Sequence, residues 1–113
     1  MAGRHLHMDC RATLHLSDRD AIVDWMREAA KQAGMTVLGN LGVYLPGPLD
    51  SGPGVSVVML IAESHLAVHS WPEHGVITMD FYSCKEWNPK PVLESFRKTF
   101  GMTEVIQVSD TPR

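Results

Sequence analysis

The sequence predicts an α+β fold, a two-layer α/β sandwich in which two helices cover one face of a mostly antiparallel sheet. Two segments, near residues 18–33 and 88–101, carry apolar residues at helical spacing. Shorter segments rich in β-branched and aromatic residues surround them, and most of these lie together in the middle of the chain. Grouped strands favour antiparallel pairing, and two helices on one face would bury both apolar helix surfaces. We summarise the predicted order as βαβββαβ.

A chain of 113 residues is expected to form one domain, residues 1–113. A domain of this size buries roughly 65% of its unfolded surface, so its core is thin and dimerisation would stabilise it.

The first strand is expected from Arg4 to Arg11, where polar and apolar residues alternate. His5, His7 and Asp9 fall on one face of this strand. Two histidines and a carboxylate resemble a metal triad, but no further ligand cluster lies nearby in the sequence. We therefore favour a polar strand face, with no metal, over a metal site.

The first helix is expected from Asp18 to about Ala33. Ser17 can cap its first turn, and Gly34 follows its last turn. Its apolar residues recur at helical spacing and are expected in the core: Ile22, Val23, Trp25, Met26, Ala29, Ala30 and Ala33.

The segment from Met35 to Leu45 is typical of a strand with a bulge, because two glycines and an asparagine interrupt its apolar residues. Residues 46–54 have the composition of a loop. Val55 to Ala62 is an apolar run interrupted only by Ser56, and we expect it to be the most buried strand.

Residues 66–70 and 76–84 are predicted to form a hairpin around the turn at 72–75. If the turn centres near residue 73, the numbers of paired residues sum to about 147. Cys84 then falls opposite Glu63 and Ser64.

Asn88 is expected to cap the second helix, with Pro89 at its first position and Gly101 after its end. The segment from Glu104 to Val108 is expected to form a last, peripheral strand, and the final residues are expected to fray.

The composition indicates neither nucleic acid nor a membrane as a partner. The formal charge is −3, from 13 acidic and 10 basic residues without runs. The longest apolar run, Val57 to Ala62, is far shorter than the ~20 residues that cross a bilayer, and the N-terminus lacks a signal-peptide pattern. A cytoplasmic protein is expected, in which Cys10 and Cys84 stay free thiols.

The stretch from Glu63 to Cys84 holds most of the chemically able side chains. Ser64 follows a carbonyl that it can attack, with histidines and a thiol in the same block. This suits either a nucleophilic hydrolase or a serine that attacks its own preceding peptide bond. The hydrolase is disfavoured, because no Gly-x-Ser-x-Gly elbow and no Cys-Gly-[Ser/Ala]-Cys pattern is present.

The run Glu-Ser-His-Leu-Ala-Val-His-Ser-Trp-Pro-Glu-His-Gly at 63–75, followed by Asp80 and Cys84, resembles the prokaryotic S-adenosylmethionine decarboxylases, which are pyruvoyl enzymes. Residues 3–6 (Gly-Arg-His-Leu) and 54–56 (Gly-Val-Ser) also resemble that family. The resemblance spans most of the chain. It implies a pyruvoyl-dependent carboxy-lyase that serves spermidine and polyamine biosynthesis.

The resemblance also implies that the chain cleaves itself between Glu63 and Ser64. Ser64 would attack the Glu63 carbonyl, and the resulting ester would eliminate to dehydroalanine, which hydrolyses to a pyruvoyl group. The products would be a β chain, residues 1–63, and an α chain, residues 64–113. The pyruvoyl cofactor would form a Schiff base with the substrate amine and act as an electron sink, as pyridoxal phosphate does elsewhere.

Four residues match the family's chemical groups. Ser64 matches the cofactor precursor, Cys84 the proton donor to the decarboxylated carbon, His69 the histidine that assists elimination, and Ser56 a serine that assists processing. Along a straight strand at ~3.3 Å per residue, His69 would lie roughly 16 Å from Ser64, too far for proton transfer. The family's shared sites imply a homodimer in which His69 and Ser56 act on the Ser64 of the second protomer.

Two residues match the family's substrate-binding groups. Glu73 matches the carboxylate that holds the ribose hydroxyls, and Tyr44 sits where the family has a phenylalanine that stacks on adenine. The chain departs from the family pattern at 41–44 and in a longer link after them. S-adenosylmethionine is the expected substrate. L-arginine or L-ornithine on the same pyruvoyl scaffold, and an unprocessed homologue without enzyme activity, remain alternatives.

Overall fold

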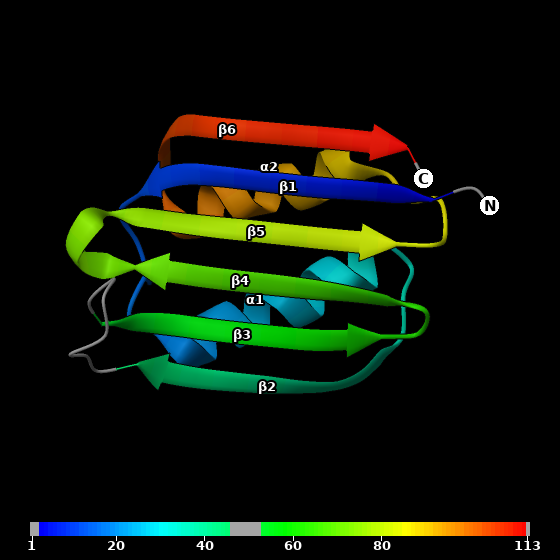
Figure 1. Ribbon diagram of the computed structural model, residues 1–113, viewed down its shortest axis with the longest axis horizontal. Coiled ribbons are helices and arrows are strands. Elements are labelled where there is room, and N and C mark those ends of the chain that lie inside the picture. Colours follow the sequence, from blue (N-terminus) through cyan, green and yellow to red (C-terminus); the bar gives the residue numbers. More distant parts are fainter. Residues whose placement is uncertain (1–2, 46–52, 113) are drawn as a thin grey trace.

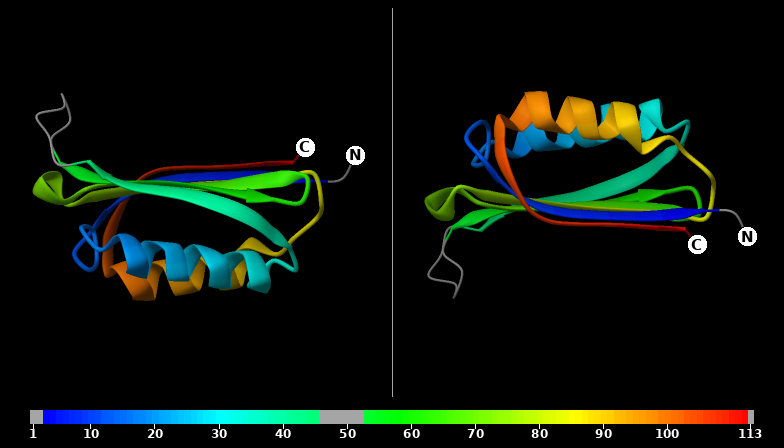
Figure 2. Two further views of the ribbon diagram at one scale, coloured as in Figure 1. Left: turned by 90° about the horizontal axis from the view of Figure 1, so that it is seen from below. Right: turned by 90° about the horizontal axis from the view of Figure 1, so that it is seen from above.

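The computed structural model describes residues 3–45 and 53–112, with the backbone alone for residues 41–45. The chain forms two layers, a sheet of six strands and a pair of helices (Figure 1). Edge-on views show both helices on the same face of the sheet, while the other face carries no helix from the part of the chain that the structure describes (Figure 2). The predicted two-layer α+β sandwich is confirmed.

The elements follow in the order β1 (Arg4–Ala12), α1 (Arg19–Gln32), β2 (Val37–Leu45), β3 (Gly54–Ile61), β4 (Ser64–Trp71), the short 3₁₀ helix η1 (Pro72–His74), β5 (Val76–Ser83), α2 (Pro89–Phe100) and β6 (Met102–Pro112). Four strands lie between the helices, so the order is βαββββαβ and the predicted order contained one strand too few. The hairpin segment supplies two full strands, β4 and β5, of eight residues each.

The strands are arranged as β2-β3-β4-β5-β1-β6, and every neighbouring pair is antiparallel. The N-terminal strand β1 therefore lies between β5 and β6, two strands that are distant from it in the sequence (Figure 1). β6 closes one edge of the sheet and pairs with β1 up to Pro112. The prediction that the final residues fray was wrong for residues 109–112, because β1 is long enough to pair with all of them.

Both helices begin and end at residues that the sequence marks. The α2 boundaries are confirmed, since the Asn88 side chain accepts a hydrogen bond from the Lys90 amide and Gly101 has φ 60°. For α1 the predicted cap was wrong. Asp18, rather than Ser17, caps the helix, because its backbone is extended and its carboxylate accepts from the Ala21 amide at 3.0 Å.

The core lies between the sheet and the helices, and it takes alternate residues from each strand. On β3 this leaves Val58 and Leu60 exposed at 42% and 59%. The expectation that this strand is the most buried one therefore holds for one face only, because no helix covers the other. Trp25 and Met26 are core residues as predicted. Neither described helix is long and apolar enough to cross a membrane.

We call the face of the sheet without helices the open face. Residues on β1, β3, β4 and β5 that alternate with the core residues point toward it. They are mostly polar: His5, His7, Asp9, Arg11, Ser56, His65, His69, Thr78, Asp80 and Tyr82.

Candidate functional site

The bond between Glu63 and Ser64 lies at the turn of the β3–β4 hairpin. Ile61 pairs with Ser64, so Ala62 and Glu63 alone connect the two strands. Glu63 has φ 62°, in the left-handed region. A residue with a Cβ adopts that conformation at a cost of about 1–2 kcal/mol. The strained residue thus contributes the carbonyl that Ser64 was predicted to attack.

The Ser64 hydroxyl is buried and has no hydrogen-bond partner among the described residues. A buried hydroxyl without a partner costs about 1–3 kcal/mol relative to one that is paired. Ser64 lies directly opposite Ser83 on β5, and it is on the same face of β4 as the core residues Leu66 and Val68. Its side chain therefore points toward the helix layer, away from the open face.

The predicted register of the hairpin is confirmed. Ser64 pairs with Ser83 and Trp71 with Val76, so paired residue numbers sum to 147. Continuing that register by one residue puts Cys84 opposite Glu63. Cys84 is a free thiol, partly exposed, with Sγ 3.9 Å from the Tyr82 hydroxyl.

A cavity of about 430 Å³ opens beside this turn. Three residues with reactive or charged side chains line it, Cys84, Glu63 and Lys85. The rest of the lining consists of Gly34, Met35, Thr36 and Ala62. The Lys85 ammonium donates a hydrogen bond to the Gly34 carbonyl at 2.9 Å. The cavity therefore combines a thiol, a carboxylate and an ammonium next to the Glu63–Ser64 bond.

Ser56 and His69 form a pair of their own. They lie opposite each other on β3 and β4, and the His69 ring nitrogen Nδ1 is 2.9 Å from the Ser56 hydroxyl. Both side chains point to the open face. His69 lies five residues along β4 from Ser64, which is roughly 16 Å at ~3.3 Å per residue. Within one chain, the structure does not bring this pair to Ser64.

The two predicted substrate-binding residues also lie far from Ser64. Glu73 is exposed in η1, beyond the opposite end of β4. The Tyr44 backbone pairs with Val55, again at the end of the sheet away from the Glu63 turn. The Tyr44 side chain and residues 46–52 of the predicted loop at 46–54 lie outside the described residues, and Gly54, the last residue of that loop, is the first residue of β3.

A polar cluster on the open face was not assigned a role from the sequence. His5 Nε2 contacts Asp80 Oδ1 at 2.7 Å, and His65 Nε2 lies 3.9 Å from the same oxygen. The Tyr82 ring lies between the two imidazoles. The hairpin register could have placed Asp80 and Tyr82 near His65, but the addition of His5 depends on where β1 inserts.

The histidines and the carboxylate considered for metal binding are engaged in pairs instead. His7 Nε2 contacts Asp9 Oδ1 at 3.1 Å, while His5 contacts Asp80. Within residues 3–45 and 53–112, no group of three or more histidine, cysteine or acidic side chains is placed to hold a metal ion.

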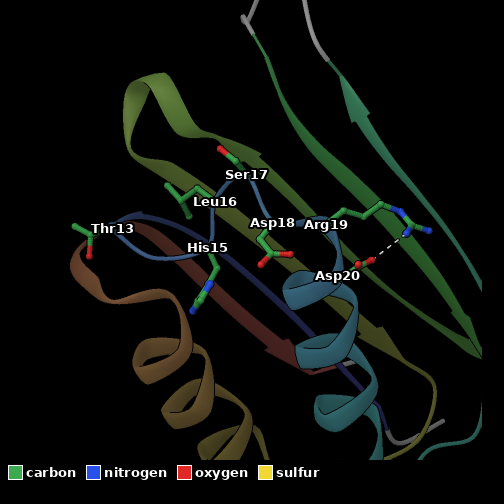
Figure 3. A pocket seen from close by; sticks show the side chains of 7 residues that line it. All are labelled: Thr13, His15, Leu16, Ser17, Asp18, Arg19 and Asp20. Atoms are coloured by element: carbon green, nitrogen blue, oxygen red, sulfur yellow. Dashed lines mark hydrogen bonds and ion pairs between the residues drawn. The ribbon is translucent and has the colours of Figure 1, made fainter.

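A larger cavity, about 720 Å³, lies elsewhere, at the passage from β1 into α1 (Figure 3). It is lined by Thr13 and by the residues from His15 to Asp20, and it includes none of the predicted site residues. The Asp18 carboxylate already caps α1, and Arg19 contacts Asp20 at 3.2 Å (Figure 3). Its charged groups are therefore engaged with the chain itself.

The second cysteine has a different character from Cys84. Cys10 is fully buried on the core side of β1. Burial, with a smaller contribution from the neighbouring Asp9 carboxylate, raises the pKa of the Cys10 thiol from 9.0 to about 11. Cys10 is thus an inert core thiol, and Cys84 is the accessible one.

Comparison with known proteins gives one consistent result. The family model of S-adenosylmethionine decarboxylase matches residues 4–113. A curated S-adenosylmethionine decarboxylase proenzyme from Pyrobaculum neutrophilum has 38% sequence identity to this chain in an alignment that covers 74% of the chain. The proenzyme from Acidithiobacillus ferrooxidans has 36% identity in an alignment that covers 80% of it. The matched regions cover 66% and 65% of those relatives, so the chain spans about two thirds of their length. The proenzyme from Thermomicrobium roseum is 32% identical, over 95% of this chain and 91% of its own length.

The fold is also shared with a solved structure. The crystal structure of the adenosylmethionine decarboxylase from Aquifex aeolicus aligns with a TM-score of 0.74 at 21% sequence identity. The alignment covers 99% of this chain and 88% of that one. At this identity the likeness concerns the arrangement of helices and strands.

Proposed function

The chain belongs to the S-adenosylmethionine decarboxylase family, and we propose on that basis that it is a self-processing, pyruvoyl-dependent decarboxylase of S-adenosylmethionine. The observation that carries the proposal is the condition of the Glu63–Ser64 bond. A left-handed residue is followed there by a buried serine hydroxyl that has no partner among the described residues. Cleavage would give a β chain, residues 1–63, and an α chain, residues 64–113, that begins with the pyruvoyl group.

The processing reaction uses only atoms of this bond and one water molecule. Ser64 Oγ attacks the Glu63 carbonyl carbon. The bond from that carbon to the Ser64 nitrogen breaks, the nitrogen takes up the hydroxyl proton, and an ester now joins the two residues. Elimination then takes a proton from the Ser64 Cα and releases the Glu63 carboxylate. Water then hydrolyses the remaining dehydroalanine. Its nitrogen departs as ammonia, and the ketone of the pyruvoyl group is left. Strain at Glu63 and the unpaired hydroxyl both raise the energy of the starting state, so both favour the first step.

A second copy of the chain is proposed to supply the base for the elimination. His69 points to the open face and is held by Ser56, but in its own chain it is roughly 16 Å away from Ser64. Proton transfer needs contact at about 3 Å, so a His69 of another copy is required.

A twofold dimer that joins two open faces meets this need. The Glu63 turn and the His69–Glu73 region lie at opposite ends of the same sheet. A twofold axis across the face lays one end of the first copy over the other end of the second, and it does so twice. The exposed Val58 and Leu60 on this face would be buried in such a dimer.

Cys84 is proposed as the proton donor of the decarboxylation. The pyruvoyl ketone supplies the electron sink for the bond that breaks. The substrate carbon that loses carbon dioxide has to receive a proton, and Cys84 lies opposite Glu63 with its thiol partly exposed. The neighbouring cavity of about 430 Å³ offers room for part of a substrate there.

Substrate recognition is proposed to use Glu73 for the ribose hydroxyls and Tyr44 for the adenine ring. Glu73 is exposed at the His69 end, so in the face-to-face dimer it would serve the same mixed site as His69. A carboxylate also attracts the guanidinium of arginine or the ammonium of ornithine, so Glu73 alone does not select the substrate.

The proposal is tested by the mass of the purified protein and by its substrate. Two chains divided at residue 63, with a ketone-reactive α chain, are expected from the wild type and a single intact chain from Ser64→Ala. The processed protein should release carbon dioxide from S-adenosylmethionine faster than from L-arginine or L-ornithine. A wild-type chain that stays whole would refute self-processing. Faster turnover of either amino acid would replace the substrate and keep the pyruvoyl chemistry.

A further inference from the structure

The Tyr82 ring is fixed between two imidazoles on the open face. It lies directly opposite His5 on β1 and His65 on β4. The His65 ring stacks on it, with ring centres 5.2 Å apart and planes inclined by 9°. The His5 ring meets it edge-on, with ring centres 5.6 Å apart and an angle of 74°. Contacts on both flanks leave the ring little freedom to turn.

One carboxylate holds the first of these imidazoles and lies near the second. Asp80, two residues before Tyr82 on β5, contacts His5 at 2.7 Å and lies 3.9 Å from His65. Three neighbouring strands therefore fix the direction of the Tyr82 ring. The hydroxyl at its end points along β5 to Cys84, with the oxygen 3.9 Å from Sγ.

We propose that Tyr82 is a positioning residue for Cys84, whose hydroxyl orients the thiol as proton donor and stabilises the thiolate that remains after proton transfer. The proposal rests on the proposed role of Cys84 in decarboxylation. It concerns a residue that acts through Cys84 and does not itself touch the substrate.

The hydroxyl can serve both states of the sulfur because it both accepts and donates hydrogen bonds. Before the reaction the thiol donates to the Tyr82 oxygen. The thiol proton then moves to the substrate carbon that has lost carbon dioxide, and a thiolate is left. The hydroxyl turns and donates to this thiolate, until water returns a proton to the sulfur. A hydrogen bond to a charged acceptor is about twice as strong as a neutral one, so the net effect favours the thiolate.

Other charged groups near the thiol do not replace this contact. Lys85 and Glu63 line the same cavity, but the Lys85 ammonium is held by the Gly34 carbonyl at 2.9 Å. His5 and His65 on the neighbouring strands, and Asp80 on β5 itself, contact one another or the Tyr82 ring.

The test is the substitution Tyr82→Phe, which removes one oxygen and keeps the ring between the imidazoles. Alkylation of Cys84 by iodoacetamide at one pH near neutrality is followed by mass spectrometry of its peptide. We expect alkylation to slow by about three- to tenfold, because fewer thiolates are present without the donor. Buried Cys10 is the internal control and should stay unlabelled in both proteins.

Two further measurements separate this role from a loss of structure and from the proposed function. Thr78→Val removes a hydroxyl from the same strand and face, four residues from Tyr82, and should leave the alkylation rate unchanged. The rates are also compared in chains carrying Ser64→Ala, which cannot process and need no activity. In the processed enzyme, Tyr82→Phe should lower kcat by about three- to tenfold and change KM by less than about twofold.

Equal alkylation rates for Tyr82→Phe and the parent chain would overturn the proposal, whether or not the protein decarboxylates anything. Slower alkylation with an unchanged kcat would overturn the catalytic part, since the thiolate would then not matter in turnover. Absence of all decarboxylation in the wild type, with slowed alkylation in the variant, would refute the proposed function and leave the Tyr82–Cys84 contact standing.

Discussion

Two inactive variants are expected to restore processing in each other if every site draws on two copies of the chain. Ser64→Ala removes the nucleophile, and His69→Ala removes the proposed base of the elimination. Each variant alone should stay essentially whole. When the two chains are unfolded together and refolded, mixed dimers form in which one site holds an intact Ser64 from one chain and an intact His69 from the other.

The expected fraction of cleaved chains follows from the geometry of the shared site. His69 lies five residues from its own Ser64, roughly 16 Å along β4 and on the other face of the sheet, so it cannot act within its chain. A mixed dimer has one complete site, and the other site lacks both groups. With equal amounts and random pairing, about half of the His69→Ala chains sit in mixed dimers, so about half of them should be cleaved. The Ser64→Ala chains should not be cleaved at all.

Intact-mass measurement distinguishes the chains when one carries a purification tag, and pulling on that tag verifies that mixed dimers have formed. His74→Ala serves as the matched control, because His74 is exposed in η1 and has no proposed role in cleavage. This variant should process by itself like the wild type. Demonstrably mixed dimers in which no His69→Ala chain is cut would refute the shared site, and so would rapid cleavage of His69→Ala alone.

Two predictions concern the free energy of unfolding, measured by urea unfolding of the chain that Ser64→Ala keeps uncleaved. Ser70→Ala should cost about 2 kcal/mol or more, because the buried Ser70 hydroxyl donates to the Leu16 carbonyl at 2.5 Å and accepts from the Val55 amide at 3.2 Å. A loss below about 0.5 kcal/mol would contradict that account of two buried groups left unpaired. Because burial and Asp9 raise the pKa of the Cys10 thiol from 9.0 to about 11, the native state resists its deprotonation. This contribution is fully present below about pH 9 and is lost as the pH rises toward 11, so stability should fall over that window and Cys10→Ala should flatten the fall. An equally steep fall in Cys10→Ala would assign the pH dependence to other groups.

Patterns with short sequence separation were enough for the elements themselves. The spacing of apolar residues predicted both helices, and Asn88 with Gly101 marked the ends of α2 correctly, because caps depend on neighbouring backbone groups alone. Alternation predicted which residues of β1 face the core. The turn at 72–75 fixed the hairpin register, and the register placed Cys84 opposite Glu63. The family motif depends on residue identity and was also visible in the sequence.

What depends on long-range contacts was decided by the tertiary structure alone. The sequence could not tell that β1 inserts between β5 and β6, and only this insertion brings His5 to Asp80 and Tyr82. Nor could the apolar run of β3 reveal that helices cover one face only, which leaves Val58 and Leu60 exposed. Strand order and layer coverage arise from the packing of the whole chain, where the burial of one segment depends on where distant segments settle. Local periodicity is the same whichever neighbour a strand acquires, so these facts are absent from it.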